Sequence, residues 1–153
     1  MKKFLVALVA MFCVTAVSAQ FSNVGVRFGS GTAITAQYDL SKANHIDGRI
    51  GFGGGWTSIT GIYNWSLKSF DWTPGLGKWF FDAGVGPQAA LFLKDDGGVY
   101  VGAAGDAKFG IKFNKVPIKL AIDYTPGVGL MCTNGGGFRG SWFNFGLSCV
   151  YCF

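Results

Sequence analysis

Three observations on this sequence predict an all-β fold. The 153 residues include 25 Gly and 16% aromatic residues, a combination of permissive backbone and large rings that is typical of strands and turns. Glutamate is absent, although the exposed faces of helices usually carry it. Apolar and polar residues also alternate with a period of two over long stretches, which indicates strands with two different faces.

Composition and charge exclude several classes of protein. With 50% hydrophobic and 14% charged residues, the chain is neither disordered nor collagen-like. The formal net charge is +5, but Lys2 and Lys3 belong to an N-terminal segment that we expect to be removed. The other eleven of the 13 basic residues are scattered singly, without a basic stripe. We therefore expect no nucleic-acid partner.

Residues 1–19 are expected to be a secretory signal peptide, which leaves residues 20–153 as one domain. The segment has two lysines, an apolar stretch over residues 4–17 and a small-residue cleavage site at its end. A membrane-anchor helix is the alternative, but the apolar run is shorter than the roughly 18 residues that span a bilayer. A lipoprotein signal needs a small residue before its cysteine, whereas Phe12 precedes Cys13.

The clearest strand is predicted over residues 99–113. Its odd-numbered positions are apolar or small, and its even-numbered positions carry all of its charged residues. A turn at 114–116 joins it to a second strand over 117–126, and the two form a hairpin. The same alternation returns at the C-terminus over 143–153.

Five weaker strands precede these three, which makes eight in all. They are expected over residues 22–29, 32–40, 45–54, 58–67 and 70–79. Pro74 lies inside the last of them, where it would remove a ladder hydrogen bond and produce a bulge.

Charged residues gather on one face of these strands, and the other face is almost uncharged. The charged face holds five basic and five acidic residues, namely Arg27, Arg49, Lys108, Lys112, Lys119, Asp39, Asp47, Asp71, Asp106 and Asp123. Equal numbers can pair, and the lumen of an eight-stranded barrel is just wide enough for side chains to fill it. We therefore predict an eight-stranded antiparallel up-and-down transmembrane β-barrel with a side-chain-filled lumen. These ten residues would form an ion network inside it, and the uncharged face would meet hydrocarbon.

Connection lengths give a second indication of such a barrel. The turns at 41–44, 68–69 and 114–116 are short and are expected on the periplasmic side. The stretches 80–98 and 127–140 are long and are expected on the external side.

A known family shows the same patterns. The signal, the eight alternating segments, the stretches 61–65, 72–77 and 116–126, and the C-terminal Tyr151 and Phe153 resemble small eight-stranded outer-membrane β-barrel proteins, particularly those of Bacteroidetes-type bacteria. The resemblance implies a location in the cell outer membrane, among its lipids and lipopolysaccharide. It also implies that Tyr151 and Phe153 are an assembly signal read by the barrel-assembly machinery. The chain departs from the family in its short first loops, a proline within a strand, and three cysteines after residue 19.

No catalytic, cofactor or metal site is expected. The single histidine, His45, is expected in an exposed turn, and Ser41 beside it is ordinary turn composition rather than part of a triad. The odd number of cysteines after residue 19 leaves at least one of Cys132, Cys149 and Cys152 unpaired, and their spacing fits no zinc site. Small apolar fillers are the simpler interpretation of all three. The glycine runs lack the Lys-Ser/Thr ending of phosphate loops.

An apolar stretch around the predicted external segment is the one candidate binding surface. It contains Trp79, Phe80, Phe81, Leu91 and Phe92, which are unusual residues for a loop. Such a surface would bind a partner, a lipid or a host molecule. The alternative is that both arms continue the neighbouring strands beyond the membrane.

Together these patterns predict a non-enzymatic integral outer-membrane protein with a structural or surface-interaction role and an unidentified external ligand. The alternative is a secreted or periplasmic soluble β-barrel that binds an apolar ligand, with the same two faces inverted. A pore or a lipid-modifying enzyme is a third class, which a filled eight-stranded lumen does not favour. The first two are distinguished by which face of the strands lies inside.

Overall fold

The computed structural model describes residues 21–93, 97–132 and 136–153. The signal peptide expected over residues 1–19 lies outside these ranges. Within them, no helix is long and apolar enough to cross a bilayer.

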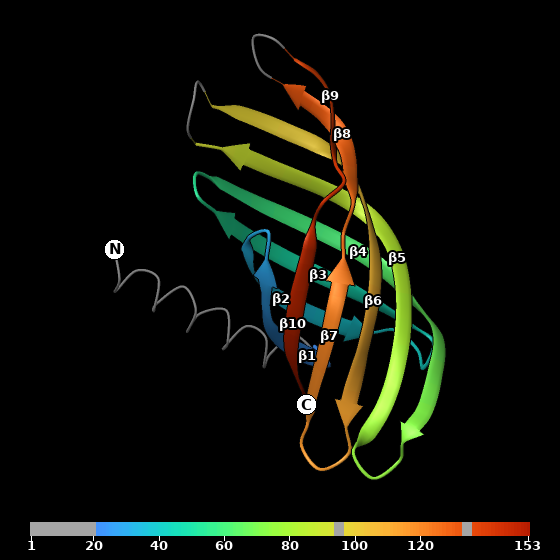
Figure 1. Ribbon diagram of the computed structural model, residues 1–153. Coiled ribbons are helices and arrows are strands. Elements are labelled where there is room, and N and C mark those ends of the chain that lie inside the picture. Colours follow the sequence, from blue (N-terminus) through green and yellow to red (C-terminus); the bar gives the residue numbers. More distant parts are fainter. Residues whose placement is uncertain (1–20, 94–96, 133–135) are drawn as a thin grey trace.

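Ten strands form one antiparallel sheet that closes on itself (Figure 1). They are β1 (Asn23–Gly29), β2 (Thr32–Asp39), β3 (Asn44–Gly53), β4 (Trp56–Thr73), β5 (Gly77–Phe92), β6 (Gly98–Phe113), β7 (Ile118–Tyr124), β8 (Gly127–Cys132), β9 (Gly137–Ser141) and β10 (Phe145–Cys152). β5 pairs with β4 on one side and β6 on the other, while β1 pairs with β2 and β10, so the ring is complete.

The ten strands occupy eight positions around the barrel. β7 and β8 follow one another along the same edge of β6, separated by Thr125 and Pro126. β10 and β9 do the same along β7 and β8. The structure is therefore a closed eight-stranded antiparallel barrel with neighbouring strands in chain order, and the predicted fold class is confirmed.

The two ends of the barrel are distinguished by their connections. The turn end carries the β2–β3, β4–β5 and β6–β7 turns and the C-terminus (Figure 1). The loop end carries the β1–β2, β3–β4, β5–β6 and β8–β9 connections. At the loop end β9 pairs only with β8 among the described residues, and the short β1–β2 hairpin does not reach it.

The strands in the middle of the chain differ from the sequence prediction. That prediction placed a turn at 68–69 between strands over 58–67 and 70–79, which is wrong. Instead β4 continues to Thr73 and the turn follows at 74–76. Its first residue is a proline, whose missing N–H removes no ladder hydrogen bond in a turn.

The two stretches expected as long external loops are mostly strand. Residues 80–98 contain most of β5, and residues 127–140 contain β8 and most of β9. β5 and β6 are 16 residues long, and β4 is 18 residues long, so this side of the barrel forms its tallest wall. The prediction of two long loops is therefore wrong for most of these residues. The alternative, in which both arms continue the neighbouring strands, describes the structure better.

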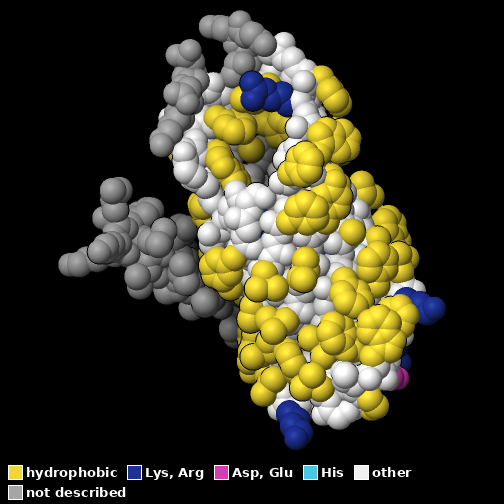
Figure 2. All heavy atoms as spheres, viewed as in Figure 1, with side chains coloured by type: hydrophobic (Ala, Val, Ile, Leu, Met, Phe, Trp, Pro, Cys, Tyr) yellow, Lys and Arg dark blue, Asp and Glu magenta, His cyan; other side chains and the backbone are white. Residues whose placement is uncertain are grey.

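Large apolar side chains cover the outside of the barrel, and charged side chains lie inside it. On the outside, Val101, Ile122 and Leu147 are 53%, 62% and 52% exposed, and hydrophobic side chains cover much of the surface seen in Figure 2. Inside, seven charged residues are 6% exposed or less, namely Arg27, Asp47, Arg49, Asp82, Asp106, Lys108 and Asp123. A water-soluble barrel has the opposite arrangement.

Candidate functional site: the polar lumen

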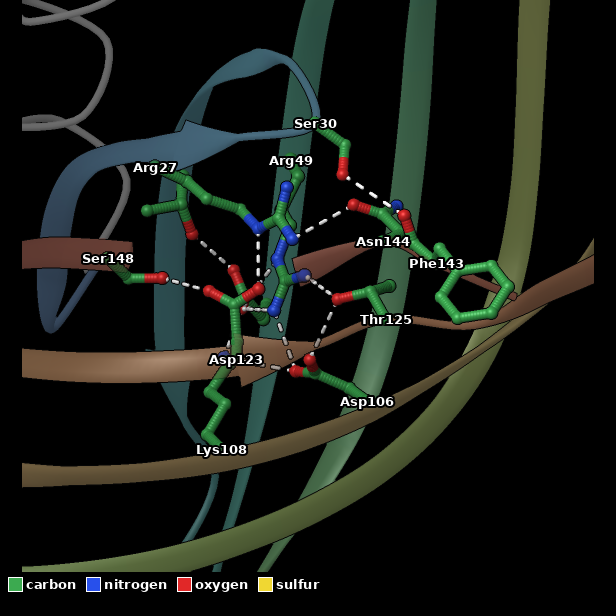
Figure 3. A network of polar contacts seen from close by, with 12 residues as sticks. Arg27, Ser30, Arg49, Asp106, Lys108, Asp123, Thr125, Phe143, Asn144 and Ser148 are labelled. Atoms are coloured by element: carbon green, nitrogen blue, oxygen red, sulfur yellow. Dashed lines mark hydrogen bonds and ion pairs between the residues drawn. The ribbon is translucent and has the colours of Figure 1, made fainter. Parts of the chain in front are cut away.

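The centre of the lumen is an ion cluster around Arg49 of β3. The Arg49 Nη2 donates to Asp47 Oδ2 at 2.9 Å and to Asp106 Oδ2 at 2.6 Å. Lys108 binds the same two carboxylates, with its Nζ 3.2 Å from Asp106 Oδ2 and in direct contact with Asp47. Thr125 completes the cluster, because it accepts from Arg49 Nη1 at 2.9 Å and donates to Asp106 Oδ1 at 3.2 Å (Figure 3).

A second ion pair lies beside this cluster. Arg27 Nε donates to Asp123 Oδ1 at 2.6 Å, and Arg27 Nη2 donates to Asn144 Oδ1 at 3.0 Å (Figure 3). The Ser148 hydroxyl donates to the other oxygen of Asp123. Every oxygen of this buried carboxylate therefore has a donor, which is the condition under which a buried charge is tolerated.

Charge balance and topology explain why these side chains meet. Within the network three cations meet three anions, and a fourth buried acid, Asp82, lies instead beside His45. Partners come from distant parts of the chain, since 57 residues separate Arg49 from Asp106 and 96 separate Arg27 from Asp123. The alternation of each strand points the side chain inward, and closure of the barrel brings the strands together. The network therefore links β1, β3, β6 and β7 from inside.

Four residues of the predicted network lie outside it. Asp39, Asp71 and Lys112 are exposed and Lys119 is half-buried, and none has an ion pair in the part of the chain that the structure describes. All four lie toward the turn end, where the strands leave the closed part of the lumen. Lys112 stands in register between Lys78 and Lys119, so like charges surround it and water is the favourable environment.

His45 was expected in an exposed turn, and this prediction is wrong. It lies inside β3 at 6% exposure, on the same face as Asp47 and Arg49, with its Nε2 4.0 Å from Asp82 Oδ2. Asp82 was assigned to an external loop, but it is a buried residue of β5. The two-residue spacing from His45 to Asp47 was the sequence signal that the prediction missed.

The five apolar residues expected to form one external surface do not do so. Trp79, Phe80 and Phe81 begin β5 at the turn end, whereas Leu91 and Phe92 finish it at the loop end. Twelve residues of strand separate Trp79 from Leu91, which is about 40 Å. The Trp79 ring instead stacks on Phe109 of β6, with 5.4 Å between the ring centroids.

The C-terminal aromatic residues lie on the outside at the turn end. Tyr151 and Phe153 are 49% and 74% exposed, and their rings form an edge-to-face pair with centroids 5.2 Å apart. This leaves both side chains accessible, and their role as an assembly signal stays a prediction. The three cysteines after residue 19 form no disulfide in the described structure, and only Cys152 among them is buried.

Between the ion network and the loop end, the lumen holds a cavity of about 360 Å³. Arg27, Arg49 and Thr125 of the network lie on its inner side. Its outer part reaches the β1–β2 connection and β9, which pairs only with β8 among the described residues. The ion network thus separates this cavity from the turn end.

A double-mutant cycle on Arg27 and Asp123 tests the second ion pair. We expect each single change to alanine to lower the free energy of unfolding by about 3 kcal/mol, because it leaves a buried charge without its partner. The double variant is expected to be more stable than the sum of the two losses by about 2 kcal/mol. Urea unfolding followed by tryptophan fluorescence measures all four proteins.

The control cycle combines Arg27→Ala with Asp71→Ala, because Asp71 is exposed and outside the network. These two changes are expected to add within about 0.5 kcal/mol. If the stability losses of Arg27→Ala and Asp123→Ala were also additive, the contact between these two side chains would contribute no coupling energy.

Comparisons with protein-family models, with curated proteins and with solved structures return no match to this chain.

Proposed function

We propose that this chain is an integral outer-membrane barrel without enzymatic activity, with a structural or surface-interaction role. One observation carries the proposal: the buried ion network lies inside the closed sheet and large apolar side chains stand outside it. Hydrocarbon favours that arrangement, because it has no water to solvate an outward charge. Outer-membrane lipids and lipopolysaccharide would be the surroundings of the outer face, and the barrel-assembly machinery would act on the C-terminal aromatic pair.

The soluble alternative requires the apolar faces to line a cavity and the charged residues to face water. Asp47, Asp106 and Asp123 have the opposite orientation, which favours the membrane proposal over the soluble one. The filled centre of the lumen also favours a structural or interaction role over a pore, because charged side chains occupy the path of conduction.

Fractionation and gel migration test the membrane proposal. We expect the full chain, made in a Gram-negative host, to be recovered with outer membranes and to resist extraction by alkaline carbonate. We also expect an unheated sample to migrate in a detergent gel at a different position from a boiled one, because closed barrels resist unfolding by detergent. A folded monomer in detergent-free buffer would contradict the proposal.

A lysine placed on the outer face provides a sharper comparison. Val85 lies near the middle of β5 and is 51% exposed, whereas Leu93 follows the end of this strand and is 74% exposed. If lipid surrounds the barrel, Val85→Lys should cost about 2 to 4 kcal/mol and reduce the heat-modifiable band, and Leu93→Lys should have little effect. Equal effects of the two variants would instead indicate a water-exposed surface.

A further inference from the structure

The cavity at the loop end has two kinds of wall. Trp56, Phe92 and Met131 supply apolar surface, and three arginines, Arg27, Arg49 and Arg139, supply positive charge. No acidic residue is among the described residues that line it. Its volume of about 360 Å³ is within the range of cavities that hold small organic molecules.

A buried phenol in the cavity wall has no hydrogen-bond partner. Tyr100 of β6 is 8% exposed, and no described residue accepts from or donates to its hydroxyl. Two glycines leave room for the ring: a Cβ at Gly129 would lie 2.8 Å from the Tyr100 Cζ, and one at Gly102 would lie 2.9 Å from the hydroxyl oxygen. A buried hydroxyl without a partner is unfavourable, so an acceptor in the cavity would relieve that cost.

Arg139 supplies a charge that the ion network does not use. It stands opposite Gly129 in the β8–β9 pairing, lines the cavity, and takes part in none of the ion pairs between described residues. Figure 2 shows the hollow at the loop end with a basic side chain at its rim and hydrophobic side chains within. A guanidinium in this position can bind a carboxylate with two parallel hydrogen bonds.

We propose that this cavity binds a small organic acid. Its carboxylate would face Arg139 and the Tyr100 hydroxyl, and its apolar body would lie against Trp56 and Phe92. A neutral apolar ligand would leave the Tyr100 phenol unsatisfied and make no use of the Arg139 charge, and an inorganic anion would leave the apolar wall without contacts. The inference goes beyond the membrane proposal and does not depend on it, because the cavity belongs to the closed barrel in either environment.

Fluorine NMR with two matched probes tests the ligand class. 4-Fluorobenzoate and its uncharged analogue 4-fluorobenzamide are titrated into the folded full-length barrel, in zwitterionic micelles or, if the protein proves soluble, in buffer. Empty micelles correct for partition of the probes. We expect saturable binding of the benzoate and at least about tenfold weaker binding of the benzamide, because only the former pairs with a guanidinium. Equal binding of the two, or saturable binding of neither, would overturn the proposal.

Three variants then test the site itself. Arg139→Gln removes the charge and Tyr100→Phe removes only the hydroxyl, so each should weaken benzoate binding by about tenfold. Lys115→Gln makes the same charge change in the exposed β6–β7 turn at the opposite end and should leave binding unchanged. Heat-modifiable migration confirms that each variant is folded. Benzoate affinity that is unaffected by Arg139→Gln, or competition by sulfate equal to that by unlabelled benzoate, would overturn the site.

Discussion

Replacing Asp47 by alanine is expected to lower the free energy of unfolding by about 3 to 5 kcal/mol. Asp47 accepts from Arg49, Lys108 and Thr35, and it is 1% exposed. Its removal leaves Asp106 as the one acidic partner of two buried cations in the central cluster. The lumen would then hold an excess positive charge that is largely shielded from water, and unfolding in urea would begin at a clearly lower concentration.

Two further variants show whether the loss of stability comes from the charge of Asp47, from its volume or from its position in the barrel. Asp47→Asn keeps nearly the same volume and hydrogen-bonding atoms but removes the charge, so we expect a loss smaller than that of alanine. Asp39→Ala removes a carboxylate that is exposed at the end of β2, and should change stability by at most about 0.5 kcal/mol. Equal unfolding midpoints for Asp47→Ala and Asp39→Ala would contradict a stabilising ion network.

Alternation was sufficient to predict the barrel where one face of a strand is consistently charged. In β6, Asp106 and Lys108 alternate with outward residues such as Phe109, and the two-residue period survives the whole strand. The inward direction of the six network charges follows from the same period. Even Ile62, which interrupts the polar face in the sequence, keeps the inward direction and is fully buried among the lumen side chains.

The sequence prediction missed most of β5 because the local sequence of this strand is not typical of a strand. Trp79, Phe80 and Phe81 are consecutive aromatic residues, so no polar partner marks the inward direction of Phe80. Proline is rare inside a strand, yet here Pro87 coincides with a gap in the β4–β5 pairing, between the Thr60–Gln88 and Tyr63–Val85 pairs. Closure of the barrel, a property of the whole sheet, overrides both local signals.

The pairing of the buried charges also could not be obtained from the sequence. The alternation of residues predicts that Arg49 and Asp106 point inward. Which inward residues lie opposite one another depends on the stagger of the strands around the barrel. The same stagger leaves Lys112 beyond the closed part of the lumen. The cavity above the network depends on this geometry too, because Tyr100 and Arg139 line it from strands that are not adjacent along the chain.

The second large effect on stability is predicted where β4 and β5 approach each other closely. An added Cβ at Gly86 would lie 1.8 Å from the carbonyl oxygen of Gly61 and 2.8 Å from the Cα of Ile62. Both obstacles are backbone atoms, so no side chain can rotate away. Gly86→Ala should therefore force the two strands apart and cost at least about 3 kcal/mol, with loss of the heat-modifiable folded band.

Gly61→Ala is the matched control, because it makes the same chemical change on the strand that Gly86 approaches. A Cβ at Gly61 would have no atom within 4 Å, and we expect its effect to stay within about 0.5 kcal/mol. Both glycines lie in the β4–β5 pair and both gain one methyl group. The two variants therefore differ only in the direction in which that methyl group points. Folding of Gly86→Ala as efficiently as Gly61→Ala would mean that β4 and β5 do not approach each other this closely.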